Sequence, residues 1–202
     1  MVGALGIPPA ELALGYPMTI DFPPQISTLK DQLDAASEKA AAIIRSAPVE
    51  RLTTRPISGG WSAVECLIHL NLTTKQYIPL INAQIVQARA DGLESAGPFR
   101  MDWTGRFLAW FLEPPYRKRS KTMPGAIPDR PRPPGPVLEE LRALNNQLIA
   151  LLQDANGLSF EDIKIVSPFN GRVKYNLYST FRILTAHERR HLWQAEKTLE
   201  TL

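Results

Sequence analysis

Near the end of the chain stands His187-Glu188-Arg189-Arg190-His191-Leu192-Trp193-Gln194, a segment with two histidines four residues apart. Apolar residues around it recur with helical spacing, which predicts a last helix from about Asn176 to Glu200. On such a helix residues i and i+4 lie on one face about one turn apart, so both imidazoles can point at the same spot. The only other histidine, His69, lies in another amphipathic segment. If the three converge, they form a three-nitrogen metal site with open coordination positions.

Composition places the chain among ordinary globular proteins. Of its 202 residues, 44% are hydrophobic and 21% are charged, which suits one domain with an insertion. A net charge of only +3 makes nucleic acid an unfavoured partner. Cys66, the single cysteine, excludes an internal disulfide and fits a reducing compartment. With no signal-peptide pattern and no apolar run near the roughly 18 residues of a membrane span, we expect a cytoplasmic protein without a membrane partner.

Four segments have the three- and four-residue spacing of apolar residues that is typical of amphipathic helices. They are predicted from Ser27 to near Pro48, from Ser62 to about Arg89, over Val137–Ala155, and from about Asn176 to Glu200. Prolines and glycines predict an extended N-terminal arm over residues 1–25. Ile163-Lys164-Ile165-Val166 is too short to found a sheet. The pattern therefore predicts an all-α protein, an antiparallel four-helix bundle that forms a single domain over residues 26–202.

A proline-rich insertion, residues 91–136, separates the second and third main helices. Trp103–Leu112 predicts a short apolar helix, and the prolines after it predict a long loop over the bundle. Trp103, Trp110 and Phe111 could roof a pocket or form a dimer surface, although core packing is the simplest role. Residues 116–132 hold six basic residues against one acidic residue, which could clamp an anionic substrate or form a solvated loop.

The start of the second helix carries a capping box, with Ser62 as the N-cap and Glu65 at position N3. Glu65 also lies one turn before His69, so it is a candidate catalytic base or a group that orients His69. Cys66 could be a fourth metal ligand or a small buried residue that packs with Trp61. Each residue therefore has a structural role that explains it without chemistry.

Two residues of the last helix also have alternative roles. Gln194 is a second candidate catalytic residue, since it could contact a metal-bound water, or it could form an interhelical hydrogen bond. Glu188 could accept a hydrogen bond from a metal ligand or could pair with Arg189 or Arg190 at the helix surface.

The segments Trp61–Leu70 and His187–Gln194 resemble motifs of the DinB/YfiT-like superfamily of four-helix-bundle metalloproteins. In that family a tryptophan and a small polar residue open a helix whose motif ends in His-Leu, and the last helix carries His-x-x-x-His. The resemblance implies that His69, His187 and His191 hold one divalent metal ion per chain, usually zinc or nickel. It suggests a metal-dependent hydrolase or a transferase that uses a low-molecular-weight thiol on a small-molecule substrate. Relatives are often dimers, which implies a homodimer.

Two other functions stay open at the level of sequence. The first is a non-enzymatic binding module that uses the bundle and the basic loop 116–132 to hold a partner or nucleic acid. The second is a metal that acts only as a structural staple, in which case chelation would unfold the protein. Four long helices should bury enough surface without a metal, so a staple is the less favoured of the two.

Overall fold

The computed structural model describes residues 22–115, 122–128 and 132–202, and in these segments the chain is mostly helical. The four long helices are α1 (Pro24–Arg45), α3 (Ala63–Ala90), α5 (Pro134–Asp154) and α6 (Leu177–Glu200). Most of the N-terminal arm expected over residues 1–25 lies outside the described residues, and its last two residues begin α1. α1 and α5 each start with proline at the first helical position, where no backbone N–H is needed.

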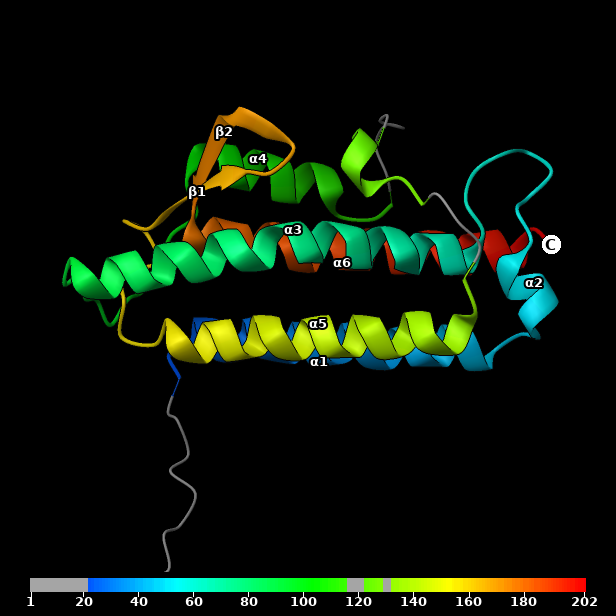
Figure 1. Ribbon diagram of the computed structural model, residues 1–202, viewed down its shortest axis with the longest axis horizontal. Coiled ribbons are helices and arrows are strands. Elements are labelled where there is room, and N and C mark those ends of the chain that lie inside the picture. The colour runs from blue at the N-terminus through cyan, green and yellow to red at the C-terminus, as the bar shows by residue number, and fades with distance from the viewer. Residues whose placement is uncertain (1–21, 116–121, 129–131) are drawn as a thin grey trace, which may run out of the picture.

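These helices form two layers, with α1 beside α5 and α3 beside α6 (Figure 1). Each long helix packs against two others, because α1 and α3 both contact α5 and α6. The short helix α2 (Val49–Thr53) lies at the end where α3 begins, and α4 (Trp103–Leu112) lies over the layer of α3 and α6. The 3₁₀ turn η1 (Pro124–Ala126) rests against α3.

The expectation that residues 163–166 form no sheet is wrong. β1 (Lys164–Ser167) pairs antiparallel with β2 (Asn170–Asn176), with Ile165 opposite Tyr175. Both of these side chains are buried, so a two-stranded hairpin is stabilised by its contact with the helices rather than by further strands. Pro168 and Phe169 form the turn that connects the two strands.

The core consists of two hydrophobic clusters. One includes Tyr77, Ile81, Leu184 and the hairpin residues Ile165 and Tyr175. The other lies toward α2 and includes Leu52, Leu67, Leu70 and Leu192. His187 falls where α6 passes from one cluster to the other, and His69 lies on α3 among the last residues of the second cluster.

The aromatic residues of α4 do not pack in the core. Trp103 is 83% exposed and Trp110 is 54% exposed, so core packing is the wrong expectation for both. The buried face of this short helix instead carries its small residues, Gly105 and Ala109. Among the described helices, none combines the length and the apolar character needed to cross a membrane.

Candidate metal centre

The structure brings the three histidines together from two helices. His69 comes from α3, and His187 and His191 come from successive turns of α6. One ring nitrogen of each lies within 4.8 Å of the others, and Nε2 of His69 lies 3.0 Å from Nε2 of His187. Two nitrogens bound to one tetrahedral zinc ion at about 2.0–2.1 Å would be roughly 3.3 Å apart. The spacing of the cluster is therefore close to what a divalent ion requires.

His69 is oriented by the backbone of the insertion. Its Nδ1–H donates a hydrogen bond of 2.6 Å to the carbonyl oxygen of Ala126 in η1. This contact fixes the proton on Nδ1 and leaves the lone pair of Nε2 facing His187. Gln76 in turn holds η1, since its Nε2 donates to the carbonyl of Gly125 at 2.9 Å.

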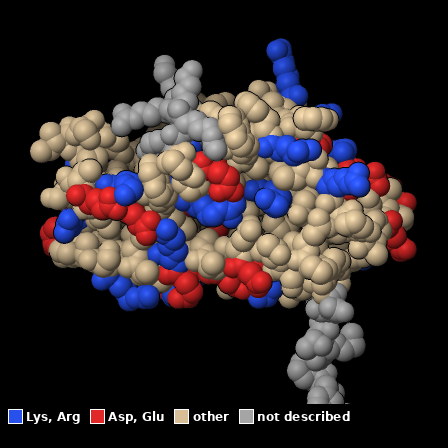
Figure 2. Space-filling model, turned by 180° about the vertical axis from the view of Figure 1, so that it is seen from behind, with Lys and Arg blue, Asp and Glu red and all other residues tan. Residues whose placement is uncertain are grey.

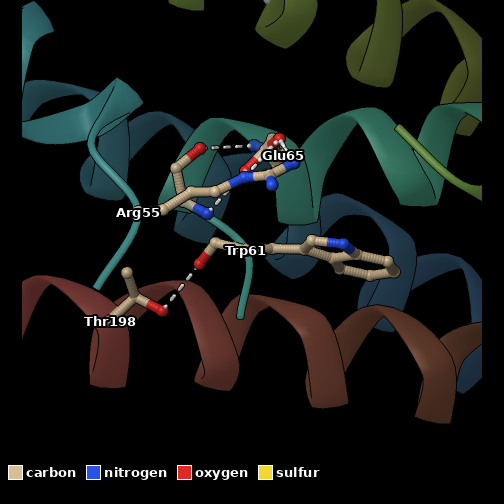
Figure 3. A network of polar contacts seen from close by, with 5 residues as sticks. Arg55, Trp61, Glu65 and Thr198 are labelled. Carbon is tan, nitrogen blue, oxygen red and sulfur yellow. Dashed lines mark hydrogen bonds and ion pairs between the residues drawn. The ribbon is translucent and has the colours of Figure 1, made fainter. Parts of the chain in front are cut away.

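Trp61 covers one side of the cluster. Its ring centroid lies 4.7 Å from that of His69 and 5.8 Å from that of His191. Figure 3 shows the indole lying between α3 and α6, while the carbonyl of Trp61 accepts a hydrogen bond from Thr198 of α6 at 3.2 Å. The apolar ring excludes water from one side of the imidazoles and leaves the other side open.

The electrostatic environment keeps the imidazoles neutral. Burial lowers the pKa of His187 and of His191 well below the usual range, and the neighbouring histidines and Arg190 lower both further. Burial also lowers the pKa of His69, although the hydrogen bond to Ala126 opposes this shift. Neutral imidazole is the form that binds metals, so no proton has to be removed at neutral pH.

One further observation fits a metal. Nδ1 of His191 is buried and has no hydrogen-bond partner among the described residues. A buried polar atom without a partner is costly, and an ion is one of the groups that can satisfy it. Together with the spacing and the neutral state, this makes the three residues a donor set that fits a divalent ion.

The cluster opens into a cavity of about 620 Å³. Its walls combine apolar side chains from α4 and α6, among them Leu108, Phe111 and Leu184, with hydroxyl groups of Thr73 and Tyr77. The described residues that line the cavity include no aspartate and no glutamate. A reacting group in this cavity would therefore meet imidazoles, hydroxyls, apolar surface and the basic side chains of Arg190 and Lys197, but no carboxylate from the described part of the chain.

Glu65 is not among the described residues that line the cavity, and it forms the predicted capping box. Its carboxylate accepts a hydrogen bond from the backbone N–H of Ser62 at 2.9 Å, while its own N–H donates to the Ser62 side chain. The same carboxylate pairs with Arg55 from the preceding loop, as Figure 3 shows. Burial raises the pKa of Glu65, but the hydrogen bonds from Arg55 and Ser62 outweigh it and leave that pKa below the usual range. The structural role expected for this residue is thus present.

The other candidate residues named from the sequence lie in different places, and only one of them lines the cavity. Cys66 is fully buried in the second core cluster and is not part of the histidine group, and burial raises the pKa of its thiol. Gln194 lines the cavity and lies beside His191, whose charged form it stabilises. Glu188 is buried against α5, where it contacts Asn145, so the surface ion pair expected for it is wrong.

Some residues of the site are not among the candidates named from the sequence. The carbonyl of Ala126 belongs to a proline-rich loop without any residue pattern that marks it. Tyr77 shares a stripe with His69 and Thr73 at intervals of four residues, so helical spacing could have found it. Its partner Tyr175 lies in a strand that the sequence does not predict.

Comparison with known proteins identifies a family for this chain. A family model for the DinB superfamily matches residues 32–195, a span that includes all three histidines. Neither the curated proteins nor the solved structures give a match to this chain.

Proposed function

We propose, for a chain that belongs to the DinB superfamily, that His69, His187 and His191 hold one divalent metal ion and that the protein is a metal-dependent enzyme for a small molecule. The observation that carries the proposal is the convergence of three neutral imidazoles at the wall of a 620 Å³ cavity. Catalytic metal sites commonly combine three protein ligands with an open position for water or substrate. A cavity of this size suits a small-molecule ligand.

A divalent ion in this site would supply Lewis acidity and would lower the pKa of a thiol or a water that it coordinates. His69 would be held in the ligand orientation by Ala126, and Trp61 would exclude water from one side. Gln194, which lies beside His191 in the cavity wall, would donate a hydrogen bond to a bound nucleophile. Glu65 serves the site indirectly, since its capping box sets the start of α3.

Thiol-dependent transfer is the reaction that the cavity favours over hydrolysis. A free thiol has a pKa of about 8.5, whereas water is a far weaker acid and commonly needs a general base. The described lining residues offer no carboxylate for that purpose. We therefore place transfer of a low-molecular-weight thiol to a small electrophile first, and metal-dependent hydrolysis second.

Metal analysis of the purified protein tests this proposal directly. We expect close to one zinc or nickel ion per chain, and we expect His187→Ala and His69→Ala to lose it. Cys66→Ala is the matched control and should keep the metal, because the thiol lies in the core away from the cluster. A protein that contains no metal and cannot be loaded with zinc or nickel would refute the metal site. A metal-loaded protein that hydrolyses esters but consumes no thiol would reverse the order of the two reactions.

We also infer that the four long helices form the antiparallel bundle of the family, with residues 26–202 as one domain and residues 91–136 as an insertion in it. The homodimer stays a prediction, which the molar mass in solution tests.

Binding of nucleic acid through loop 116–132 has little support, although residues 116–121 and 129–131 lie outside the described residues. Arg132 of this loop pairs with Glu140, and Figure 2 shows basic and acidic side chains intermixed on one face of the molecule.

A further inference from the structure

Three hydroxyl groups gather in the cavity wall away from the histidines. They belong to Tyr77 of α3, Ser167 of β1 and Tyr175 of β2, and we call them the hydroxyl cluster. The two tyrosine oxygens lie 2.5 Å apart, and Ser167 is within hydrogen-bonding reach of both. Tyr77 is 4% exposed and Tyr175 is 1% exposed, so the cluster forms a closed end of the cavity. The opposite end, at Gly59 and Gly60, is exposed to solvent.

One face of α3 connects the two polar regions of the cavity. His69, Thr73 and Tyr77 follow one another at intervals of four residues, and all three line the cavity. With a rise of about 1.5 Å per residue, Tyr77 lies about 12 Å along the helix from His69. Leu112 of α4 and Leu184 of α6 contribute apolar walls. The cavity thus presents the histidines, then apolar surface with the single hydroxyl of Thr73, and then the hydroxyl cluster to anything bound along it.

Thr73 supplies an independent indication that this part of the cavity can bind a polar group. The residue is 4% exposed, and its Oγ1 has no hydrogen-bond partner among the described residues. Threonine in a helix commonly bonds to a carbonyl of the preceding turn, and a buried hydroxyl without any partner is unusual. The unpaired group lies halfway between the histidines and the hydroxyl cluster.

The surroundings of the hydroxyl cluster disfavour charge. Burial raises the pKa of both tyrosines, so both stay protonated. One O–H of the pair donates to the other tyrosine, which leaves the second O–H to donate to a ligand. Asp102 lies close enough to raise the pKa of Tyr175 further, and the same field would repel an anion. The described lining residues from β1 and β2 include no lysine or arginine that could hold a carboxylate or a phosphate.

We propose that the hydroxyl cluster recognises an uncharged hydrogen-bonding group, such as a hydroxyl, carbonyl or amide, at the far end of the substrate. The substrate is then an elongated small molecule whose apolar body separates this group from the one that reaches the histidines. This inference rests on the proposed function for its reactive end, whereas the hydroxyl cluster itself does not depend on a metal.

A pair of matched probes tests the inference on the zinc-loaded protein. The probes are alkyl hydroxamic acids, which chelate zinc, with a chain that ends either in a hydroxyl or in a methyl group. Calorimetry should show that the hydroxyl-ended probe binds about 3- to 10-fold more tightly at the chain length that reaches the cluster. Equal affinities for the two probes at every chain length would overturn the proposal.

The double variant Tyr77→Phe/Tyr175→Phe then assigns the preference to the cluster. Removing both hydroxyls leaves neither tyrosine oxygen unpaired, and Ser167 is half-buried and still accepts a hydrogen bond from the backbone N–H of Phe169, so the variant should stay folded. We expect the preference to disappear while the methyl-ended probe binds as before. Tyr178→Phe, a change at a buried tyrosine that is not part of the cavity wall, is the control and should keep the preference. A double variant that keeps the preference would contradict the assignment.

Metal analysis of the same samples separates this inference from the proposed function. If no zinc binds, the metal proposal fails, and ligand-detected NMR with 1-hexanol tests the cluster in the metal-free protein. Binding of 1-hexanol that the double variant loses would support the recognition site. Equal binding to both proteins, or no binding to either, would overturn it.

Discussion

Nδ1 of His69 donates a hydrogen bond to the carbonyl oxygen of Ala126, at a distance of 2.6 Å. The two residues are 57 positions apart, and the contact links the proline-rich segment between α3 and α5 to the histidine cluster. Such partners commonly set the tautomer and the ring orientation of a histidine that binds a metal. The segment is thus part of the site, even though it contributes none of the three histidines.

Ala126→Leu should weaken metal binding. Ala126 is 1% exposed, so a larger side chain cannot fit without moving η1 and its carbonyl away from His69. Loss of such an orienting contact commonly lowers metal affinity about 10- to 100-fold. Zinc competition titrations measure the change. Ala88→Leu, which overpacks a buried alanine of α3 away from the cavity, is the control. An Ala126→Leu protein with wild-type affinity would show that the contact is incidental.

If the three histidines hold a metal ion as proposed, its removal should lower stability without unfolding the protein. The two core clusters pack the four long helices against one another independently of the histidines. At a free zinc concentration 100 times the dissociation constant, bound zinc would add about 2.7 kcal/mol to the free energy of unfolding. Circular dichroism with and without a chelator should therefore show the same helical signal and a lower melting temperature.

The triple variant His69→Gln/His187→Gln/His191→Gln provides the control, since the chelator should have no effect on it. Collapse of the helical signal when the chelator is added to the wild type would identify the metal as a structural staple instead.

The helices and the histidine pair could be predicted from the sequence because their signals are local. The spacing from His187 to His191 lies within two turns, and the capping box spans only Ser62 to Glu65. Convergence of His69 with this pair depended on the family resemblance, because spacing within one helix says nothing about its neighbour. The family match over residues 32–195 confirms that resemblance.

The rest of the cavity depends on contacts between distant residues, which a single sequence does not reveal. Tyr77 and Tyr175 are 98 positions apart, and Tyr175 lies in a short strand that is stable only against the helices. The surface position expected for Glu188 is wrong for a different reason. Its charge and its neighbours Arg189 and Arg190 suggest an exposed side chain, but it lies on a buried face of α6, beside Asn145.

Gly105→Ala should displace α4 from α6. A Cβ at this position would overlap Cβ and Oγ of Ser179, and it would also crowd Asp102, which caps α4. We expect the free energy of unfolding to fall by about 1–3 kcal/mol, and ligand binding to weaken because α4 forms a wall of the cavity. Urea denaturation measures the first effect and calorimetry the second.

Ser179→Gly tests the cause of this loss. It removes the atoms that the new methyl group would meet, so the double variant Gly105→Ala/Ser179→Gly should be less destabilised than the sum of its two single changes. Strict additivity would mean that the close approach of α4 and α6 is not what requires the glycine.

Glu188→Gln should stabilise the protein, and increasingly so as the pH rises. Burial raises the pKa of Glu188 to about 8, although Asn145 and Arg189 oppose the shift, and one carboxyl oxygen has no hydrogen-bond partner among the described residues. The folded state therefore holds the proton more tightly than the unfolded state, whose pKa is near 4.5. The contribution of this group to stability is complete below about pH 4.5 and is lost as the pH rises toward 8.

Glutamine cannot ionise, so the gain in the free energy of unfolding should be near zero at about pH 4.5 and should reach roughly 1–4 kcal/mol at about pH 8. Urea denaturation of metal-free protein at several pH values measures this difference. Glu139→Gln, a change at an exposed carboxylate of α5, should show no such trend. A Glu188→Gln protein that is less stable than the wild type at pH 8 would mean that the buried group is ionised and paired in the folded state.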